Sequence, residues 1–253
     1  MKLQFCLENP STGCLKVQPY FQEMMEKHAT TLDYCRFQTE DENGEMIKYP
    51  FRKPTMLCSN LPDMHELGLK CQCPNFRHAS SLIGDKAKGT RGDHGGGKSP
   101  PLHFKHMIPT EIHMEVLKRA IKGEPNSTWV LDLFSGTKSL KKACDRLNLK
   151  YIGVDIESRV KTANGHVETD IVRDLSDVNI RKIIKEASEI VGARPRDLLL
   201  LWASPPCTTF SQCQTLNAPE RRHRDYGHPQ RPALSEAAHR DDALVTNLVR
   251  QLL

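Results

Sequence analysis

The chain lacks the features of membrane, secreted and disulfide-rich proteins. No apolar run approaches the roughly 18 residues that cross a bilayer. The apolar stretch at the start of the chain ends at Glu8 and is too short for a signal peptide. The 9 cysteines are an odd number without the regular spacing of a small disulfide scaffold. We therefore expect a soluble intracellular protein, in the cytoplasm or nucleus, with no membrane partner.

Charge and length exclude less than these absences do. A chain of 253 residues, of which 26% are charged, has the size and composition of one α/β domain with an insert. The formal net charge is +5, with basic clusters at residues 86–98 and 221–224. These clusters permit a polyanionic partner without requiring one, because solvated loops explain them equally well.

Regular periodicity is missing from residues 61–101. We interpret residues 61–108 as a small irregular recognition insert within a single domain of residues 1–253. The candidate zinc ligands are Cys71, Cys73 and His78, which Cys58 or His65 could join. The Cys-x-Cys spacing is tighter than that of the usual structural zinc site. Loop thiols without a metal explain it as well, so the sequence assigns no metal.

Residues 92–99 of this insert formally match the phosphate-binding pattern G-x-x-x-x-G-K-S. That motif needs an apolar strand before it and a helix starting at its Lys-Ser. Here the polar residues 86–91 precede it, and Pro100 and Pro101 follow. We therefore reject a phosphate-binding loop and expect a basic, glycine-rich loop that contacts phosphates or has no ligand.

The most informative stretch is an apolar strand that ends at a cysteine. Residues 198–202 have the length of a buried parallel strand, and Pro205 and Pro206 interrupt it directly before Cys207. Ligands of open α/β sheets bind at the carboxyl ends of the strands. A lone cysteine is usually a small buried apolar side chain, but the forced turn favours a reactive Cys207.

A nucleotide-binding pattern precedes this strand. Residues 129–133 are predicted to form a strand that turns into a helix over 140–147, and residues 151–155 form a second strand ending in Asp155. This order is typical of half of a doubly wound sheet, in which the acid binds ribose hydroxyls. An ordinary βαβ unit with a chance carboxylate remains the alternative on these residues alone. Further helices are expected at 20–28, 110–121, 183–191 and 239–253, and a strand is expected at 30–37.

Five segments together resemble motifs of one enzyme family. They are residues 132–136 (a cofactor turn), 153–157 and 169–171 (the next two motifs), 204–211 (a nucleophile motif) and 8–10 (Glu-Asn-Pro, an acid-bearing motif). Residues 51–55 are a poorer match to an arginine-bearing motif. In this set the chain resembles the DNA cytosine-5 methyltransferases.

The resemblance implies an α/β fold with a doubly wound, mostly parallel, Rossmann-like sheet and S-adenosyl-L-methionine as cofactor. The residues that it assigns to cofactor binding are Asp132, Phe134, Ser135, Gly136, Asp155, Ile156, Asp170 and Pro205. Asp170 is expected at the end of a strand. Lys138 and Ser139 stand where the family commonly has glycines, which leaves room for altered cofactor binding.

The resemblance also implies a mechanism. Cys207 is expected to add to carbon 6 of a cytosine flipped out of DNA, with Glu8 as the acid at the base. Arg52, or else Lys53, is expected to contact the cytosine carbonyl. A salt-bridged Glu8 and a solvated Arg52 are the structural alternatives. We expect a monomer acting on DNA; methylation of tRNA cytosine and a catalytically weak DNA- or cofactor-binding module remain alternatives.

The order of the motifs is unusual for this family. Its cofactor motif normally comes first, whereas here Glu8 precedes Asp132. A circular permutation explains this order and predicts that residues 3–7 lie beside residues 198–202. Glu8 and Cys207 would then share one edge of the sheet, with both chain ends on one side. Two unrelated fragments that match by accident are the alternative.

Overall fold

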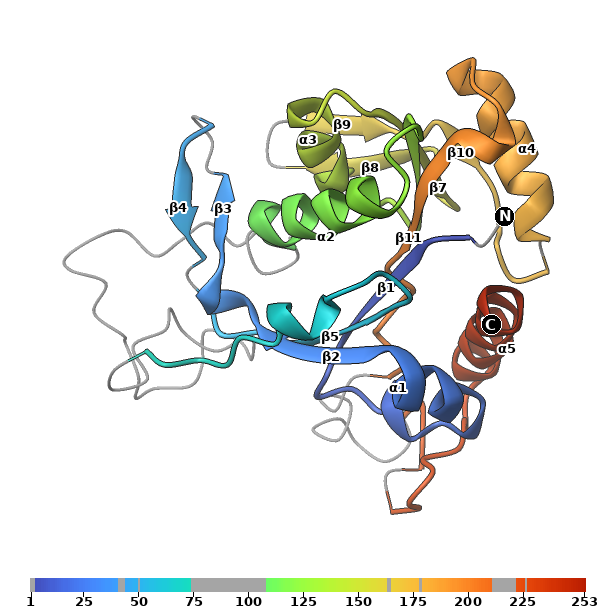
Figure 1. The fold of residues 1–253 in the computed structure, drawn as a ribbon. Coiled ribbons are helices and arrows are strands. Elements are labelled where there is room, and N and C mark those ends of the chain that lie inside the picture. Colours follow the sequence, from blue (N-terminus) through green and yellow to red (C-terminus); the bar gives the residue numbers. More distant parts are fainter. Residues whose placement is uncertain are drawn as a thin grey trace.

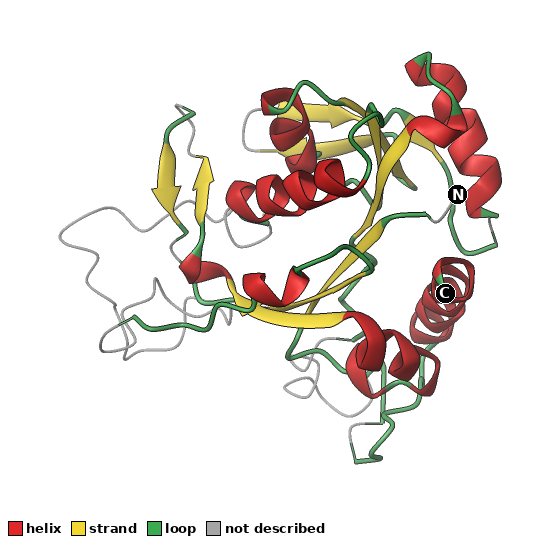
Figure 2. Ribbon diagram, viewed as in Figure 1, coloured by secondary structure: helices red, strands yellow, loops and turns green. Residues whose placement is uncertain are grey.

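A seven-stranded, mostly parallel sheet forms the centre of the molecule, with helices on both faces (Figure 1; Figure 2). The computed structural model describes residues 3–40, 44–49, 51–73, 108–162, 165–177, 179–210, 222–225 and 227–253. Residues 92–99 and most of the proposed insert lie outside these ranges. Among the described helices, none is long and apolar enough to span a membrane.

The sheet contains strands from both ends of the chain. In spatial order they are β10 (Ile171–Val172), β7 (Lys150–Asp155), β6 (Trp129–Leu133), β11 (Leu198–Ala203), β1 (Phe5–Pro10), β5 (Pro54–Ser59) and β2 (Ala29–Asp33). Two separate hairpins pair β3 (Gln38–Glu40) with β4 (Met46–Lys48) and β8 (Arg159–Thr162) with β9 (Gly165–Glu168). The helices are α1 (Gln22–His28), α2 (Thr110–Gly123), α3 (Ser139–Arg146), α4 (Ile180–Val191) and α5 (Glu236–Leu252).

Neighbouring strands run parallel from β10 to β1, and only then does the antiparallel β5 follow. If the strands are counted from β6 and the count continues from the chain end to its start, the spatial order begins 3-2-1-4-5. A doubly wound Rossmann sheet begins in the same order. The expected α/β class with a mostly parallel sheet is therefore confirmed.

The pairing of β1 with β11 was predicted and is confirmed. Phe5 lies opposite Leu201, and Leu7 opposite Ala203, in a parallel register. The start of β1 and the end of α5 face the same side of the molecule (Figure 1), and Leu3 and Leu252 pack against the same core. The first strand of the chain thus extends the sheet begun by its second half.

Alternation along the strands divides the core between the two faces. In β1, Phe5 and Leu7 join the core cluster that also contains residues of α1, α4 and α5. Cys6, between them, joins the cluster beneath α2 and α3. Both faces of the parallel strands are therefore buried, which explains why residues 198–202 are apolar without interruption.

Two expectations about strand ends are wrong. Asp170 does not end a strand but precedes β10, because the β8–β9 hairpin takes up the chain after Asp155 and returns it beside Ser158, whose carbonyl accepts from Thr169 at 3.0 Å. The strand expected at 30–37 stops at Asp33, where a 3₁₀ turn, η3 (Tyr34–Arg36), redirects the chain.

One residue of the basic cluster at 221–224 is internal to the fold. Arg224 is 0% exposed, and its guanidinium lies 4.2 Å from the centre of the Phe210 ring. It donates to Asp242 of α5 at 2.6 Å and to the carbonyl of Thr209 at 2.9 Å. Arg224 therefore joins the segment after β11 to α5, and a solvated loop does not explain it.

We expect Arg224→Met to destabilise the protein by roughly 3 kcal/mol, the lower end for removing one partner of a buried ion pair. The lower end applies because the Asp242 side chain keeps 22% exposure and can be hydrated. Arg159→Met is the control, since its pair with Glu168 is exposed on both sides and should contribute less than about 1 kcal/mol. Denaturant unfolding measures both, and equal losses would contradict the anchoring role.

Candidate functional site

The candidate site lies where the winding of the sheet reverses. β6 and β11 are neighbours, although by the order above they are its first and fourth strands. Ligands of doubly wound sheets bind in the crevice beyond the carboxyl ends of such a pair. The turn after β6 and the Pro-Pro-Cys segment after β11 meet there, and the amide of Ser204 donates to the carbonyl of Leu133 at 3.3 Å.

Glu8 is a buried carboxylate at the carboxyl end of β1. Its side chain is 7% exposed, and Oε1 accepts a hydrogen bond from the Tyr34 hydroxyl at 2.8 Å. Lys53 Nζ lies 3.8 Å from the same oxygen and 5.0 Å from the centre of the Tyr34 ring. Because Lys53 is itself only 15% exposed, the charged groups of Glu8 and Lys53 face each other in a partly desolvated environment.

Cys207 is influenced by the charges of both Glu8 and Lys53. The residue is exposed at the surface, yet enough protein surrounds the thiol for desolvation to raise its pKa. The Lys53 ammonium opposes that rise, and the Glu8 carboxylate adds to it. Because Leu7 pairs with Ala203 in parallel, Glu8 and Cys207 both follow the paired ends of β1 and β11 at one edge of the sheet.

Arg52 does not join them. Its side chain is 43% exposed, and Nε lies 3.4 Å from Oδ1 of Asp33. Arg52 thus pairs with Asp33, whereas Lys53 lies beside Glu8. The structure places Lys53 there, where Arg52 was the first expectation.

The segment that presents Cys207 is firmly anchored. The carbonyl of Cys207 accepts from the amide of Phe210 at 3.1 Å, and the carbonyl of Phe210 accepts from the amide of Cys14 at 2.7 Å. The Thr209 hydroxyl donates to Asp241 at 2.6 Å. Pro205, expected at the cofactor, is buried at the start of this turn.

The turn after β6 has an unusual backbone. Phe134, Gly136 and Lys138 have φ angles of 63°, 46° and 56°. Residues other than glycine rarely adopt this left-handed region. Such strain clusters at functional sites. The Ser135 hydroxyl between them is buried without a hydrogen-bond partner among the described residues. The Ser135 hydroxyl is therefore the polar group of this turn that the described residues leave unsatisfied.

Asp155 closes this turn from the end of β7. Oδ2 accepts from the amide of Gly136 at 2.9 Å, and Oδ1 accepts from the amide of Ile156 at 2.8 Å. Oδ1 also accepts from the amide of Glu157 at 3.4 Å, so Oδ2 is the oxygen that retains a further lone pair for a hydroxyl group. The side chain is half-buried and accessible. Ile156 is 63% exposed, an apolar surface beside the acid.

The other two acids are positioned differently from Asp155. Asp170 accepts from Lys138 Nζ at 2.7 Å and from the amide of Gly153 at 2.7 Å, so it holds the turn in place. Asp132 is 4% exposed and accepts from the Tyr151 hydroxyl at 2.7 Å. Desolvation, with the charges of Asp155 and Asp170, raises the pKa of Asp132 to about 7, against the opposing hydrogen bond from Tyr151.

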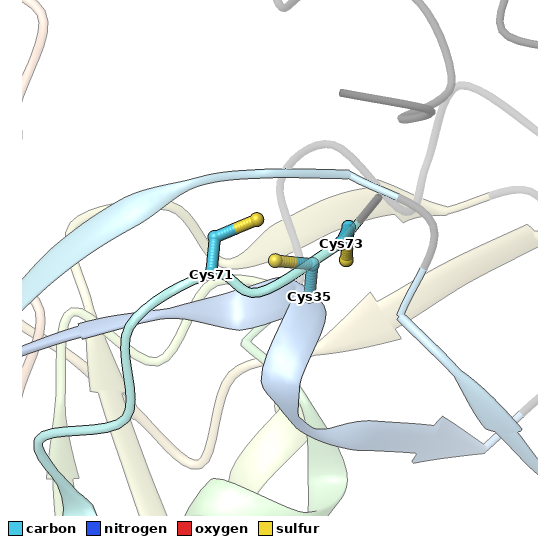
Figure 3. Close-up of side chains that lie close together, drawn as sticks. All are labelled: Cys35, Cys71 and Cys73. Carbon is cyan, nitrogen blue, oxygen red and sulfur yellow. The ribbon is translucent and has the colours of Figure 1, made fainter. Parts of the chain in front are cut away.

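Two further features were only partly visible in the sequence. The Asn9 side chain, next to Glu8, is buried with neither amide atom hydrogen-bonded to another described residue. Cys71 and Cys73 lie together with Cys35, which the sequence did not suggest because it is far away in the chain (Figure 3). That group excludes Cys58, and His65 is not part of it. His78 lies outside the described residues.

The fold and site thus define a Rossmann-like α/β protein with chemically distinctive side chains at the reversal point of its sheet. No protein-family model matches the chain, and no curated protein sequence matches it.

The charges around Cys207 predict opposite shifts in its reactivity. Lys53→Met removes the ammonium that lowers the pKa of Cys207, so alkylation by iodoacetamide should require higher pH. Glu8→Gln should move the alkylation profile to lower pH. Mass spectrometry of the Cys207 peptide measures both alkylation profiles. Lys53→Arg should preserve the wild-type profile, and Lys27→Met, at an exposed position of α1, is the control. Unchanged profiles in both variants would refute the electrostatic contact.

Burial of Asp132 predicts a pH-dependent stability cost. Because its folded pKa is raised from 3.8 to about 7, the wild type loses stability as pH rises through this interval. Asp132→Asn removes that loss while keeping an acceptor for Tyr151, so it should become more stable than wild type by about 2–4 kcal/mol above the interval. Denaturant unfolding across the pH range tests this, with exposed Asp145→Asn as the control. A difference independent of pH would contradict it.

Proposed function

We propose that this protein transfers a methyl group from S-adenosyl-L-methionine to carbon 5 of cytosine in DNA. The observation that carries the proposal is the meeting of Glu8, Lys53 and Cys207 beside the turn after β6. A carboxyl group, a cation and a thiol are the groups that the cytosine ring needs. The resemblance of their motifs to those of DNA cytosine-5 methyltransferases supports the same assignment.

The first step is activation of the ring. Carbon 6 of cytosine accepts a thiolate only when the ring is electron-poor. Glu8 hydrogen-bonds to or protonates ring nitrogen 3, an acid role that contributes roughly 10²- to 10⁴-fold. Lys53, in place of Arg52, contacts the carbonyl oxygen and withdraws further charge. Tyr34 keeps the Glu8 carboxyl group in position through its hydrogen bond.

The second step is covalent. The Cys207 thiolate forms a bond to carbon 6, and the ring electrons make carbon 5 nucleophilic. Bound S-adenosyl-L-methionine would supply an electrophilic methyl group on a sulfonium. Carbon 5 would form the new bond to that methyl group, and a neutral thioether would leave. Carbon 5 then loses its proton to solvent, the bond from sulfur to carbon 6 breaks, and Cys207 is released as a thiolate. Every bond formed to the protein is thereby broken again.

The cofactor residues present suit this ligand. Asp155 retains acceptor capacity for the ribose hydroxyls, Ile156 offers an apolar surface, and Ser135 has an unpartnered buried hydroxyl. Lys138 replaces a family glycine and has a left-handed backbone, with φ of 56°, of the kind that glycine adopts readily. The cytosine edge is inaccessible in a duplex, so the base would enter this site flipped out.

We expect tritiated S-adenosyl-L-methionine to label 5-methylcytosine in unmethylated duplex DNA, detected by nucleoside analysis. Cys207→Ser should lose the transfer, and DNA containing 5-fluorocytosine should trap wild type at Cys207, because fluorine cannot leave as a proton. Label in tRNA alone would replace DNA by RNA as the substrate. Cofactor binding without label in either would leave a binding module.

The matched control separates chemistry from cofactor binding. Cys207→Ser should bind the cofactor as wild type does. Asp155→Ala should weaken cofactor binding by about 1.5–3 kcal/mol, the range for hydrogen bonds to a charged group. Glu157→Ala, at an exposed position near Asp155, is the reference variant and should change neither cofactor binding nor methyl transfer. Calorimetric titration distinguishes the variants, and equal loss of binding in all three would oppose the site assignment.

A further inference from the structure

Three thiols from two segments far apart in the chain meet beyond the end of β2, the edge strand of the sheet. Cys35 belongs to η3, directly after β2, and Cys71 and Cys73 follow the 3₁₀ turn η4 (Met64–Leu67). Their sulfur atoms all lie within 4.8 Å of one another (Figure 3). The methyl-transfer chemistry uses none of them, so the cluster needs a separate explanation.

We propose that Cys35, Cys71 and Cys73 bind one zinc ion as thiolates. Tetrahedral zinc with bonds of about 2.3 Å to sulfur spaces its sulfur ligands about 3.8 Å apart. The observed sulfurs need to approach by no more than about 1 Å to reach that spacing. Soft thiolate ligands favour zinc over magnesium, calcium or manganese. Three protein ligands leave one of the four zinc positions, which a water molecule would fill.

The surroundings suit an anionic metal centre. Three thiolates and one Zn²⁺ carry a net negative charge, and two cations lie close by. Lys48 Nζ is 3.6 Å from the sulfur of Cys73, and the charge of Arg52 acts on Cys71. Such outer-shell partners orient and stabilise metal ligands. Arg52, which the cytosine site does not use, has a role here.

The segment carrying two of the thiols is also oriented by its backbone. Asp33 Oδ2 accepts from the amide of Cys71 at 2.8 Å, and the amide of Asp33 donates to the carbonyl of Leu69 at 2.9 Å. The carbonyl of Lys70 accepts from Arg36 at 3.2 Å. These contacts hold residues 69–73 against η3 and keep Cys71 near Cys35, although this segment has no helix or strand of its own.

Zinc binds cysteine only as the thiolate, so each of the three ligating thiols would release its proton to solvent as the metal binds.

The metal would act on the cytosine site through one residue. Cys35 follows Tyr34, whose hydroxyl donates to Glu8 and whose amide donates to the carbonyl of Lys53 at 3.2 Å. Zinc would therefore fix the turn that positions Glu8 and Lys53. Its role is structural, since none of its ligands touches the reacting atoms.

Metal analysis of protein purified under reducing conditions tests the proposal. Wild type should contain about one zinc per chain, and Cys35→Ser, Cys71→Ser and Cys73→Ser should each lose it. Cys207→Ser is the matched control, because it removes a surface thiol outside the cluster and should retain full zinc. This control also separates the proposals: it abolishes the proposed methyl transfer and must leave metal content unchanged.

Spectroscopy on wild type covers the case in which the cluster variants fail to fold. X-ray absorption should show three sulfur ligands at about 2.3 Å from zinc, and cobalt substitution should give a sulfur-to-cobalt charge-transfer band with visible bands of tetrahedral coordination. Wild type without zinc after expression in zinc-supplemented medium would overturn the proposal. Fewer than three sulfur ligands, or full zinc in a folded cluster variant, would also overturn it.

Discussion

The parallel pairing of β1 with β11 is the constraint on which the rest of the molecule depends. It joins the start of the chain to a strand near its end, and no local preference could replace it. The pairing completes a continuous parallel region from β10 to β1 and buries apolar side chains on both faces. It also aligns the carboxyl ends of β1 and β11, so that Glu8 and Cys207 lie at one edge of the sheet.

A second layer of order surrounds that space. Tyr34, Lys53 and Asp33 all lie where β2 and β5 meet the turn η3, and each contributes to either the Glu8 cluster or the thiol cluster. Neighbouring residues of one short segment, Asp33 to Cys35, therefore belong to both clusters. A metal at the thiols would stabilise the same turn that holds the acid, which explains why a segment without regular structure is placed beside a site that needs rigidity.

Several residues of the site work against stability. Asp132 is a carboxylate kept in a buried position, Asn9 and Ser135 leave buried polar atoms unpartnered among the described residues, and Phe134 has a strained backbone. Departures from good packing and hydrogen bonding concentrate where function requires them. Here they gather around the turn after β6 and the end of β1, the two places where cofactor and base would bind.

The sequence by itself determined the features that depend on short-range pattern. The apolar run before Pro205 and Pro206 predicted β11 and the turn at Cys207, and helical periodicity predicted α2 to α5, because burial of one face imposes a repeat on neighbouring residues. The pairing of residues 3–7 with 198–202 was predictable only through the family resemblance. Only the tertiary structure placed Lys53 rather than Arg52 beside Glu8, added Cys35 to Cys71 and Cys73, and buried Arg224 against α5. These placements depend on which side chains meet across elements far apart in the chain, and a local pattern carries no information about such meetings.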